Sequence, residues 1–377
     1  MKKALKHIKR ILIVTAVVIA VVCAALFGCI LYLRTFVSEP VRQDKDGKLY
    51  YMEYKGDYTS PLVTVPINMV KPVRKAGCSC FSAQDPDGGY ITGRNYDLPH
   101  FDKEGNETGL NVVLECAPEN GCRSIGTADA VWLSLLGQPY YAGGIDDPKT
   151  EKACLALLPY LCMDGMNEKG LTVSILYLDV KDGEQAVYQQ RSGKQDVILP
   201  VLLRQMLDSC ATVEEAVALA DERNVVNIFG ADFHLFVTDA AGRSAVLEWR
   251  YNEMTVTYTD IVTNFYVSWD DAEDCYKDGQ LKEKYISAQD ADGYRFGYGH
   301  GYERFATIMH RSDEYKINGQ TVMDTAAAMD TLKAVSQEYT GELTSLTQYS
   351  TVYHNNERSM DICIYPDYTE VYHFTLS

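Results

Sequence analysis

An uncharged stretch of 23 residues at 11–33, ILIVTAVVIAVVCAALFGCILYL, is the feature that most restricts what this chain can fold into. At about 1.5 Å per residue, a helix of this length spans roughly 34 Å, which is enough to cross the hydrocarbon core of a bilayer. A segment of this kind lies outside a globular core. The folded domain therefore has to come from the residues that follow it.

The charges on either side of this stretch predict its direction in a membrane. Five basic residues precede it and only Arg34 follows, so the positive-inside rule places the N-terminus in the cytoplasm. We expect a cytoplasmic basic segment over 1–10, one transmembrane helix over 11–33, and a single-pass protein of the cell membrane with all later residues extracytoplasmic. A cleaved signal peptide and a lipoprotein signal ending at Cys29 are the alternatives.

The rest of the chain is strongly acidic. The net charge is −17, and residues 1–38 hold six basic and no acidic side chains, so the rest carries 29 basic against 52 acidic groups. Such a surface repels nucleic acid, and we expect no nucleic-acid partner. Nine cysteines follow residue 33, an odd number that leaves at least one thiol free. Cys116 and Cys122 are spaced for a short disulfide, although small buried apolar roles fit most of the cysteines as well.

Strand-like segments dominate the chain after residue 77. Residues 34–77 resemble a stalk that contains one strand within 48–60. The later strands are expected at 89–95, 233–239, 244–250, 254–259, 350–354, 360–365 and 369–376. Helices are expected at 198–208, from the capping box at 212–215 to Arg223, and at 322–337. This mixture favours an α+β fold of stacked sheets with helices outside.

Known metal and nucleotide motifs are missing from the sequence. The seven histidines are scattered, and no Cys-x2-Cys pair, dinucleotide fingerprint or P-loop occurs. Cys78-Ser-Cys80 alone is too little for zinc, and a papain-like centre would need Gly77 and Cys78 in the opposite order. We expect no metal and no cofactor.

The stretch GCSCFSAQDPDGGYITGRNYD at 77–97 resembles the nucleophile region of the choloylglycine hydrolase and penicillin V acylase family. Members of that family begin, after processing, with a cysteine, and an Arg-x-x-Asp follows on the next strand. Arg94 and Asp97 stand 16 and 19 residues after Cys78, which matches the family when Cys78, and not Cys80, is the nucleophile. Five further segments match in the family's order: MDGMNEKGLTVSILYLD (163–179), FHLFVTDAAGRSAVLEW (233–249), IVTNF (261–265), YERFAT (302–307) and LTQYS (346–350).

This resemblance implies a fold and a nucleophile. The implied fold is the four-layer αββα sandwich of the N-terminal-nucleophile hydrolases, preceded here by the transmembrane helix. Cys78 would attack the substrate, and its own free α-amine would act as the base. Arg94 would lie next to the thiol and favour the thiolate, while Asp97 would orient the amine.

The resemblance also implies how the reacting oxygen is bound. Asn264, together with a backbone N–H at Tyr177, would donate hydrogen bonds to the oxyanion. Arg304 would complete the polar cluster. His234 is expected to be an ordinary, hydrogen-bonded strand histidine, and we assign it no role.

Such chemistry requires a cut between Gly77 and Cys78, because only a chain that begins at Cys78 has a free α-amine there. We expect self-cleavage, in which the Cys78 thiol attacks the Gly77 carbonyl, and glycine suits this position because it tolerates a strained backbone. The chain then divides into a stalk or propeptide at 34–77 and a hydrolase domain at 78–377.

The sequence thus predicts a membrane-anchored, extracytoplasmic cysteine amidase that hydrolyses non-peptide C–N bonds in small linear acyl amides. Bile salts, penicillin V and N-acyl amino acids are the candidate substrates. Tyr177 stands where bile-salt enzymes usually have Asn and penicillin V acylases have Tyr, and the stretch before Arg304 is short, so bile salts are disfavoured. An acyltransferase of the same family and a non-catalytic surface binding protein that is never cut are the alternatives, and a homo-oligomer is compatible with the sequence.

Overall fold

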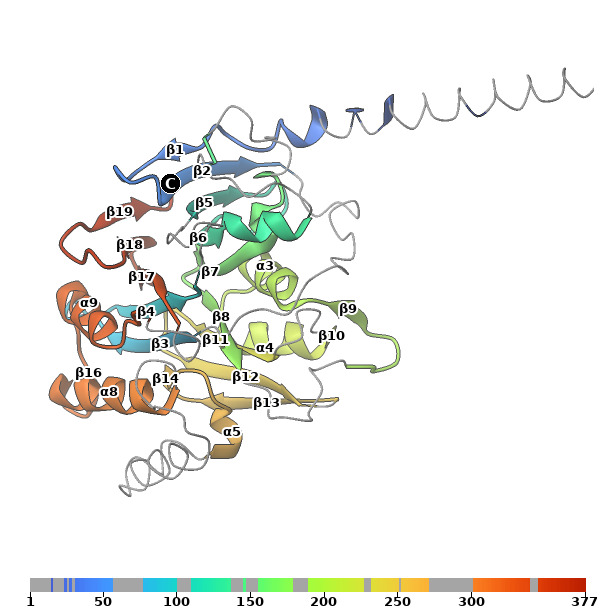
Figure 1. Cartoon of the computed structure of the whole chain (residues 1–377). Coiled ribbons are helices and arrows are strands. Elements are labelled where there is room, and N and C mark those ends of the chain that lie inside the picture. Colours follow the sequence, from blue (N-terminus) through green and yellow to red (C-terminus); the bar gives the residue numbers. More distant parts are fainter. Residues whose placement is uncertain are drawn as a thin grey trace, which may run out of the picture.

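The structure is a computed structural model of the whole chain (Figure 1). It describes residues 31–56, 77–99, 110–136, 145–146, 155–178, 189–226, 232–250, 252–270, 301–339 and 345–377, together with Thr15, 24–25 and 27–28. Two large β-sheets form its centre.

The larger sheet has nine strands in the order β1-β2-β5-β6-β7-β8-β11-β12-β13. Neighbouring strands are antiparallel except β2 and β5, which run parallel. Their bounds are β1 Val41–Arg42, β2 Leu49–Lys55, β5 Asn111–Ala117, β6 Ser124–Asp129, β7 Cys162–Asn167, β8 Thr172–Leu178, β11 Asp232–Thr238, β12 Ser244–Arg250 and β13 Glu253–Tyr258.

The smaller sheet has six strands in the order β14-β3-β4-β17-β18-β19. All of its pairs are antiparallel. The bounds are β3 Gly77–Gln84, β4 Tyr90–Asp97, β14 Ile261–Val262, β17 Thr347–His354, β18 Ser359–Ile364 and β19 Tyr372–Thr375. Two short pairs, β9 Gln195–Val197 with β10 Arg223–Val225 and β15 Lys316–Ile317 with β16 Gln320–Thr321, lie outside both sheets.

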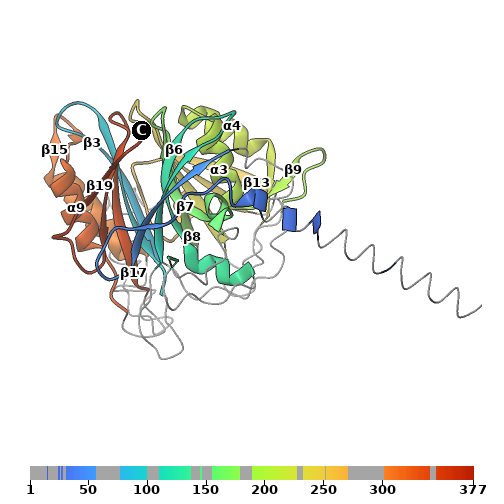
Figure 2. The same cartoon turned by 90° about the horizontal axis from the view of Figure 1, so that it is seen from above.

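Helices cover the outer faces of the two sheets, which gives four layers (Figure 2). One core lies between the nine-stranded sheet and the pair α3 and α4, and the second lies between the sheets and continues to α8 and α9. The helical elements are η1 Ala130–Leu136, η2 Leu158–Leu161, α3 Leu199–Ser209, α4 Val213–Asp221, α5 Val267–Asp270, α8 Gly301–Glu314 and α9 Thr325–Ala334.

Local signals in the sequence explain where the outer helices begin. Thr212 caps α4 by accepting a hydrogen bond from the Glu215 N–H, and the Glu215 side chain reaches back to the Ala211 N–H at 2.6 Å. Asp324 caps α9 through the Ala327 N–H at 2.8 Å. The capping box therefore starts a helix at the expected place, although α4 ends at Asp221.

The segment that was expected to form a stalk contains a strand of the nine-stranded sheet. β2 lies between β1 and β5, and its residues alternate between the two cores. Leu49 faces the core between the sheets, whereas Tyr50, Met52 and Tyr54 face the core under the helices. All four side chains are buried, so this strand is part of the folded body.

The predicted transmembrane helix is corrected by the structure. A membrane-spanning helix needs about 20 apolar residues in one continuous run. Within the described part of the chain, no helix has that length and apolar character. Much of the stretch at 11–33 lies outside the described residues. Its last three residues, 31–33, are described and are helical. The predictions of a single-pass anchor, a cell-membrane location with an extracytoplasmic domain, and a membrane partner are therefore not retained.

The cysteines that the structure describes are all thiols. Cys116 lies buried on β5 and Cys122 is half-buried, and the short disulfide considered between them is not formed. Burial raises the pKa of the Cys116 thiol to about 11. Small buried apolar roles therefore account for Cys116, Cys162, Cys210 and Cys363.

Candidate active site

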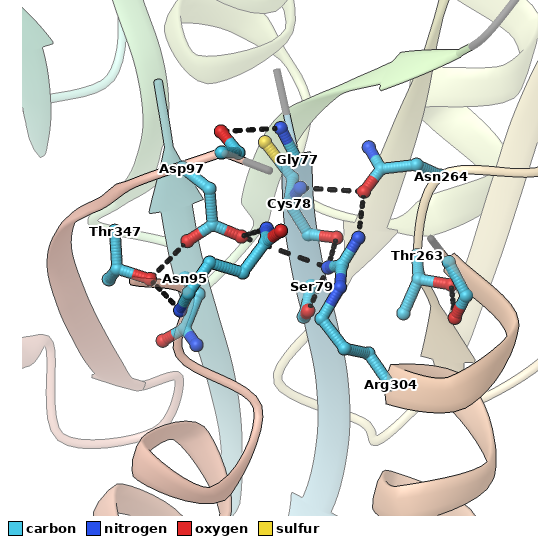
Figure 3. A network of polar contacts seen from close by, with 12 residues as sticks. Gly77, Cys78, Ser79, Asn95, Asp97, Thr263, Asn264, Arg304 and Thr347 are labelled. Carbon is cyan, nitrogen blue, oxygen red and sulfur yellow. Dashed lines mark hydrogen bonds and ion pairs between the residues drawn. The ribbon is translucent and has the colours of Figure 1, made fainter. Parts of the chain in front are cut away.

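The residues predicted from the sequence meet around the first residues of β3. Cys78, Asp97, Asn264 and Arg304 are labelled in Figure 3, where they lie around that strand. Cys78 lies on β3, Arg94 and Asp97 lie on the adjacent β4, and Tyr177 lies on β8 of the other sheet. Asn264 follows β14, and Arg304 lies in the first turn of α8. The structure thus brings together all six positions from five separate elements.

The Cys78 thiol lies against a buried arginine. Arg94 Nη2 is 3.7 Å from Cys78 Sγ, and its Nη1 is at the same distance from Cys80 Sγ. The two sulfurs lie on one face of β3, because residues two apart on a strand point the same way. Burial raises the pKa of the Cys78 thiol, whereas Arg94 and the backbone N–H groups of Asp97 and Tyr177 oppose that rise. In the uncut chain the thiol is therefore held protonated, with groups in place that favour the thiolate.

The backbone of Cys78 is also engaged on both sides. Its N–H donates to Asn264 Oδ1 at 2.7 Å, and its carbonyl accepts from Arg304 Nη1 at 2.5 Å. Arg304 also donates to Asn264 Oδ1 and to the Ser79 hydroxyl. Two donors at Oδ1 fix the orientation of the Asn264 amide, so its Nδ2 points to the Tyr177 carbonyl, 2.6 Å away.

The contacts of Asn264 and Tyr177 bear on the oxyanion-binding roles predicted for these two residues. In the uncut chain the Asn264 amide group already donates to a carbonyl, and its oxygen holds the nitrogen of the bond that would be cut. The backbone N–H of Tyr177 faces the Cys78 sulfur and lowers the pKa of that thiol. The oxyanion roles of both residues remain predictions.

Asp97 is fully buried and held by three groups. Gln337 Nε2 and Thr347 Oγ1 donate to its two oxygens at 2.6 Å each, and Arg304 Nη1 lies 3.7 Å away. Burial raises the pKa of Asp97, while Arg304, Thr347 and Gln337 counteract that rise. The carboxylate therefore has hydrogen-bond partners for its charged form despite complete burial.

Gly77 stands where a side chain has no room. A Cβ on Gly77 would lie 2.1 Å from Gln337 Nε2, the same nitrogen that donates to Asp97. The Gly77 N–H donates to Ser345 Oγ at 3.2 Å, and Gly77 is opposite Asp97 in the sheet. Close approach, more than backbone strain, explains the glycine before Cys78.

Several residues of the cluster were missed by reasoning from the sequence. Asp164 on β7 pairs with Arg94 Nε at 2.5 Å and accepts hydrogen bonds from the Tyr349 and Tyr353 hydroxyls. Asp164 and Tyr349 stand inside the segments at 163–179 and 346–350 that resemble the family, so a sequence signal for them exists. No sequence signal marked Gln337, which lies just beyond α9.

A family model of linear amide C-N hydrolases, the choloylglycine hydrolase family, matches residues 152–361. The match covers more than half of the chain, including Asn264 and Arg304, and begins after the strands that carry Cys78, Arg94 and Asp97. No sequence among the curated proteins matches the chain.

Solved structures resemble the chain in fold. Two variants of the conjugated bile acid hydrolase from Clostridium perfringens align with TM-scores of 0.51 and 0.52 at 16% and 15% identity, over 79% of this chain and 92% of theirs. Penicillin V acylase from Agrobacterium tumefaciens aligns with a TM-score of 0.50 at 17% identity, over 79% of this chain and 86% of its own. The family predicted from the sequence motifs is confirmed: this chain belongs to the linear amide C–N hydrolases of the choloylglycine hydrolase family.

Proposed function

We propose that the cluster around Cys78 is the active site of a cysteine amidase that works after the Gly77–Cys78 bond has been cut. The observation that carries the proposal is that both the thiol and the backbone nitrogen of Cys78 are held by neighbouring side chains. Its thiol lies against Arg94, and its backbone nitrogen is held by Asn264 at 2.7 Å. Cleavage would leave an α-amine at that place, and such an amine titrates near pH ~8, which suits a general base.

The first step of the proposal is self-cleavage. The Cys78 sulfur attacks the Gly77 carbonyl carbon, the C–N bond breaks, and the nitrogen takes up the proton and becomes the free amine. The acyl group is then a thioester on sulfur, which water hydrolyses to a Gly77 carboxylate and a thiol. On this proposal 34–77 lies on the upstream side of the cut and 78–377 is the hydrolase.

The second step is turnover of an amide substrate by the same sulfur. The α-amine takes the thiol proton, the thiolate attacks the substrate carbonyl, and the leaving amine receives the proton as the acyl-enzyme forms. Water then releases the acid. Asp97, buried opposite Gly77, orients the α-amine, and the Tyr177 N–H with Asn264 Nδ2 binds the oxyanion once the latter leaves the Tyr177 carbonyl.

An apolar cavity beside the cluster supports a substrate with an apolar acyl group. The cavity is small, about 30 Å³, and the support comes from its apolar lining, which includes Trp132, Met163, Ile175, Leu199 and Phe233. It connects to the cluster in two ways. Trp132 Nε1 donates to the Tyr96 hydroxyl, and Tyr96 is opposite Cys78 in the sheet. The Phe233 ring meets the Tyr177 ring edge to face at 6.0 Å.

This lining favours a compact aromatic or aliphatic acyl group. Apolar walls with polar groups at one end are typical of small-molecule sites, in which the walls bind and the polar groups orient. Together with Tyr177, the cavity supports penicillin V or an N-acyl amino acid as the substrate in preference to a conjugated bile salt.

The proposal is tested by incubating the purified chain with penicillin V, N-acyl amino acids, and glycine- and taurine-conjugated bile salts. We expect amine release from the first two classes, and we expect Cys78→Ala to reduce it at least ~10³-fold. Acyl transfer to an added amine as the main reaction would indicate an acyltransferase. Absence of turnover, together with failure of a thiol-reactive acyl probe to label Cys78, would indicate a binding protein.

A further inference from the structure

A second buried polar group lies beside the Cys78 cluster without touching it. His234 on β11 and Glu248 on β12 lie one step beyond the cross-strand pair Leu235–Leu247, and both are almost fully buried. His234 Nδ1 is 3.1 Å from Glu248 Oε1. A histidine and a carboxylate buried together in this way need a full set of partners, because an unpaired polar group in the interior costs about 1–3 kcal/mol.

Both members of this pair hold the segment that carries Asn264. His234 Nε2 donates to the Thr263 carbonyl at 2.8 Å. Glu248 accepts from the Val267 N–H at 2.8 Å, and from the N–H and hydroxyl of Ser268 at 3.0 and 2.5 Å. The pair therefore forms hydrogen bonds to the backbone on both sides of Asn264.

The protonation of the carboxylate agrees with this arrangement. Burial alone would raise the pKa of Glu248, but hydrogen bonds from His234 and Ser268 outweigh it, and the pKa is lowered. An ionised Glu248 only accepts hydrogen bonds, as does the Thr263 carbonyl. Both ring nitrogens of His234 thus face acceptors, and the ring cannot turn without losing a buried hydrogen bond.

Asn264 is the residue for which this rigidity matters. Its Oδ1 holds the Cys78 nitrogen at 2.7 Å, and a displacement of about 1 Å at a reacting centre can cost ~10²-fold in rate. Thr263, one residue earlier, also donates its hydroxyl to the Gly301 carbonyl at 2.7 Å, at the start of the helix that carries Arg304. The segment around Asn264 is therefore hydrogen-bonded to β11 and β12 on one side and to the start of α8 on the other.

We propose that His234 and Glu248 are positioning residues that fix Asn264 against the nitrogen of Cys78. Neither residue contacts the reacting atoms, so each acts through the 263–268 segment. The inference rests on the proposed function, because it assumes that Asn264 acts at Cys78. It assigns a role to His234, which the sequence indicated only as an ordinary strand histidine.

The test uses Glu248→Gln and His234→Gln in the full chain, with Asn264→Ala and the wild type measured alongside. We expect each positioning variant to lower kcat about 10–100-fold with KM changed less than about threefold, and to slow Gly77–Cys78 cleavage in parallel. The double variant Glu248→Gln/Asn264→Ala should have a kcat and a cleavage rate little lower than those of Asn264→Ala alone, because both substitutions remove the same contact. The cleavage rate remains measurable in variants that are too slow for an amide assay.

A matched control separates positioning from simple loss of stability. His354 Nε2 pairs with Asp361 Oδ2 at 2.9 Å on the β17–β18 hairpin, at the far end of β17 from Thr347. His354→Gln should lower the melting temperature yet keep kcat, whereas the positioning variants lose kcat at temperatures where they are fully folded.

The outcomes distinguish the inference from the proposed function. Wild-type kcat in Glu248→Gln, or losses that add fully to those of Asn264→Ala, would overturn the positioning role. A wild type that hydrolyses no amide, or an Asn264→Ala variant as active as the wild type, would instead overturn the proposed function.

Discussion

Cys78 and Cys80 lie equally close to Arg94, but the backbone around them differs. Arg94 lies 3.7 Å from both sulfurs, but only Cys78 follows Gly77 and has its nitrogen held by Asn264. Burial raises the pKa of Cys80 to about 12, so it stays a thiol. The assignment of the nucleophile to Cys78 therefore depends on the backbone around it more than on the neighbouring charge.

Alanine at each cysteine tests this assignment. We predict that Cys78→Ala leaves the chain uncut and inactive, because the attacking sulfur is gone. Cys80→Ala should be cut to completion and stay active while losing about 1 kcal/mol of stability. For each variant, intact mass measures cleavage and amine release measures activity. A Cys80→Ala variant that stays uncut would contradict the choice of Cys78.

A methyl group at residue 77 tests the close approach of Gln337. In Gly77→Ala the new Cβ would lie 2.1 Å from Gln337 Nε2, so the bond from Gln337 to Asp97 has to give way. We predict cleavage slowed about 10–100-fold, followed on gels over time. Once cut, the enzyme should have wild-type kcat, because residue 77 belongs to the piece upstream of the cut. A lower kcat in the cut enzyme would show that the substitution acts on the mature site.

The sequence motifs located the residues that meet at Cys78 better than the residues that hold them in place. Cys78, Arg94 and Asp97 were found because they stand at fixed spacing within one short stretch. Asp164 and Gln337 hold Arg94 and Asp97 from distant parts of the chain. Their roles depend on tertiary contacts, which a spacing pattern cannot encode.

Among the elements, β2 has the most direct consequence for processing. It lies before the proposed cut, yet all seven of its residues, Leu49–Lys55, pair with β5. Leu49, Tyr50 and Met52 are fully buried, and burial of such side chains contributes about 1.5–3 kcal/mol each.

We therefore predict that the upstream piece stays bound after cleavage. Under native conditions the two pieces should co-elute on size exclusion, and denaturant should separate them. Met52→Asp, which places a charge in the core, should weaken this association, whereas the exposed Lys55→Ala should not. A cut, active enzyme that has lost the upstream piece would contradict the structural role of β2.

The β17–β18 hairpin contains a pH-sensitive pair. Burial lowers the pKa of His354, but its hydrogen bond and ion pair with Asp361 raise it more. Burial raises the pKa of Asp361, but the hydrogen bonds from His354 and His373 lower it more. The His354 contribution is therefore complete below the ordinary histidine pKa of about 6.5 and is lost as pH rises through the raised value. The Asp361 contribution is present above about pH 4 and is lost on acidification.

Stability measured against pH tests this pair. His354→Gln should destabilise the protein by about 1.5–3 kcal/mol near pH 5.5, as for a hydrogen bond to a charged group, and by less near pH 9. Denaturant unfolding of both proteins at each pH gives the difference. A difference that does not change with pH would show that His354 is neutral throughout.

Elements with strong local signals were predicted close to their observed bounds. β12 at Ser244–Arg250 matches the expected strand at 244–250, and α3 at Leu199–Ser209 starts and ends one residue later than expected. α9 is shorter than the expected 322–337, because Asp324 caps it and it ends at Ala334. β2 was recognised as a strand, but its place between β1 and β5 depends on pairing across the chain, which periodicity does not show.

For the whole molecule, the two sheets face each other and the cluster forms where strands of both approach. β3 and β4 supply Cys78, Arg94 and Asp97 from one sheet, and β8 supplies Tyr177 from the other. The apolar stretch at 11–33 misled the prediction at this scale. Apolar character over 23 residues is compatible with a membrane but does not by itself demonstrate a continuous spanning helix.

On the proposed mechanism the enzyme works only after its chain has been cut before Cys78. Intact mass and N-terminal sequencing of the active protein, on the sample used for the amide assay, test it most directly. We expect a polypeptide that begins at Cys78 and covers 78–377, and activity that rises with the fraction cut. A fully active protein in which residue 77 is still joined to Cys78 would contradict it.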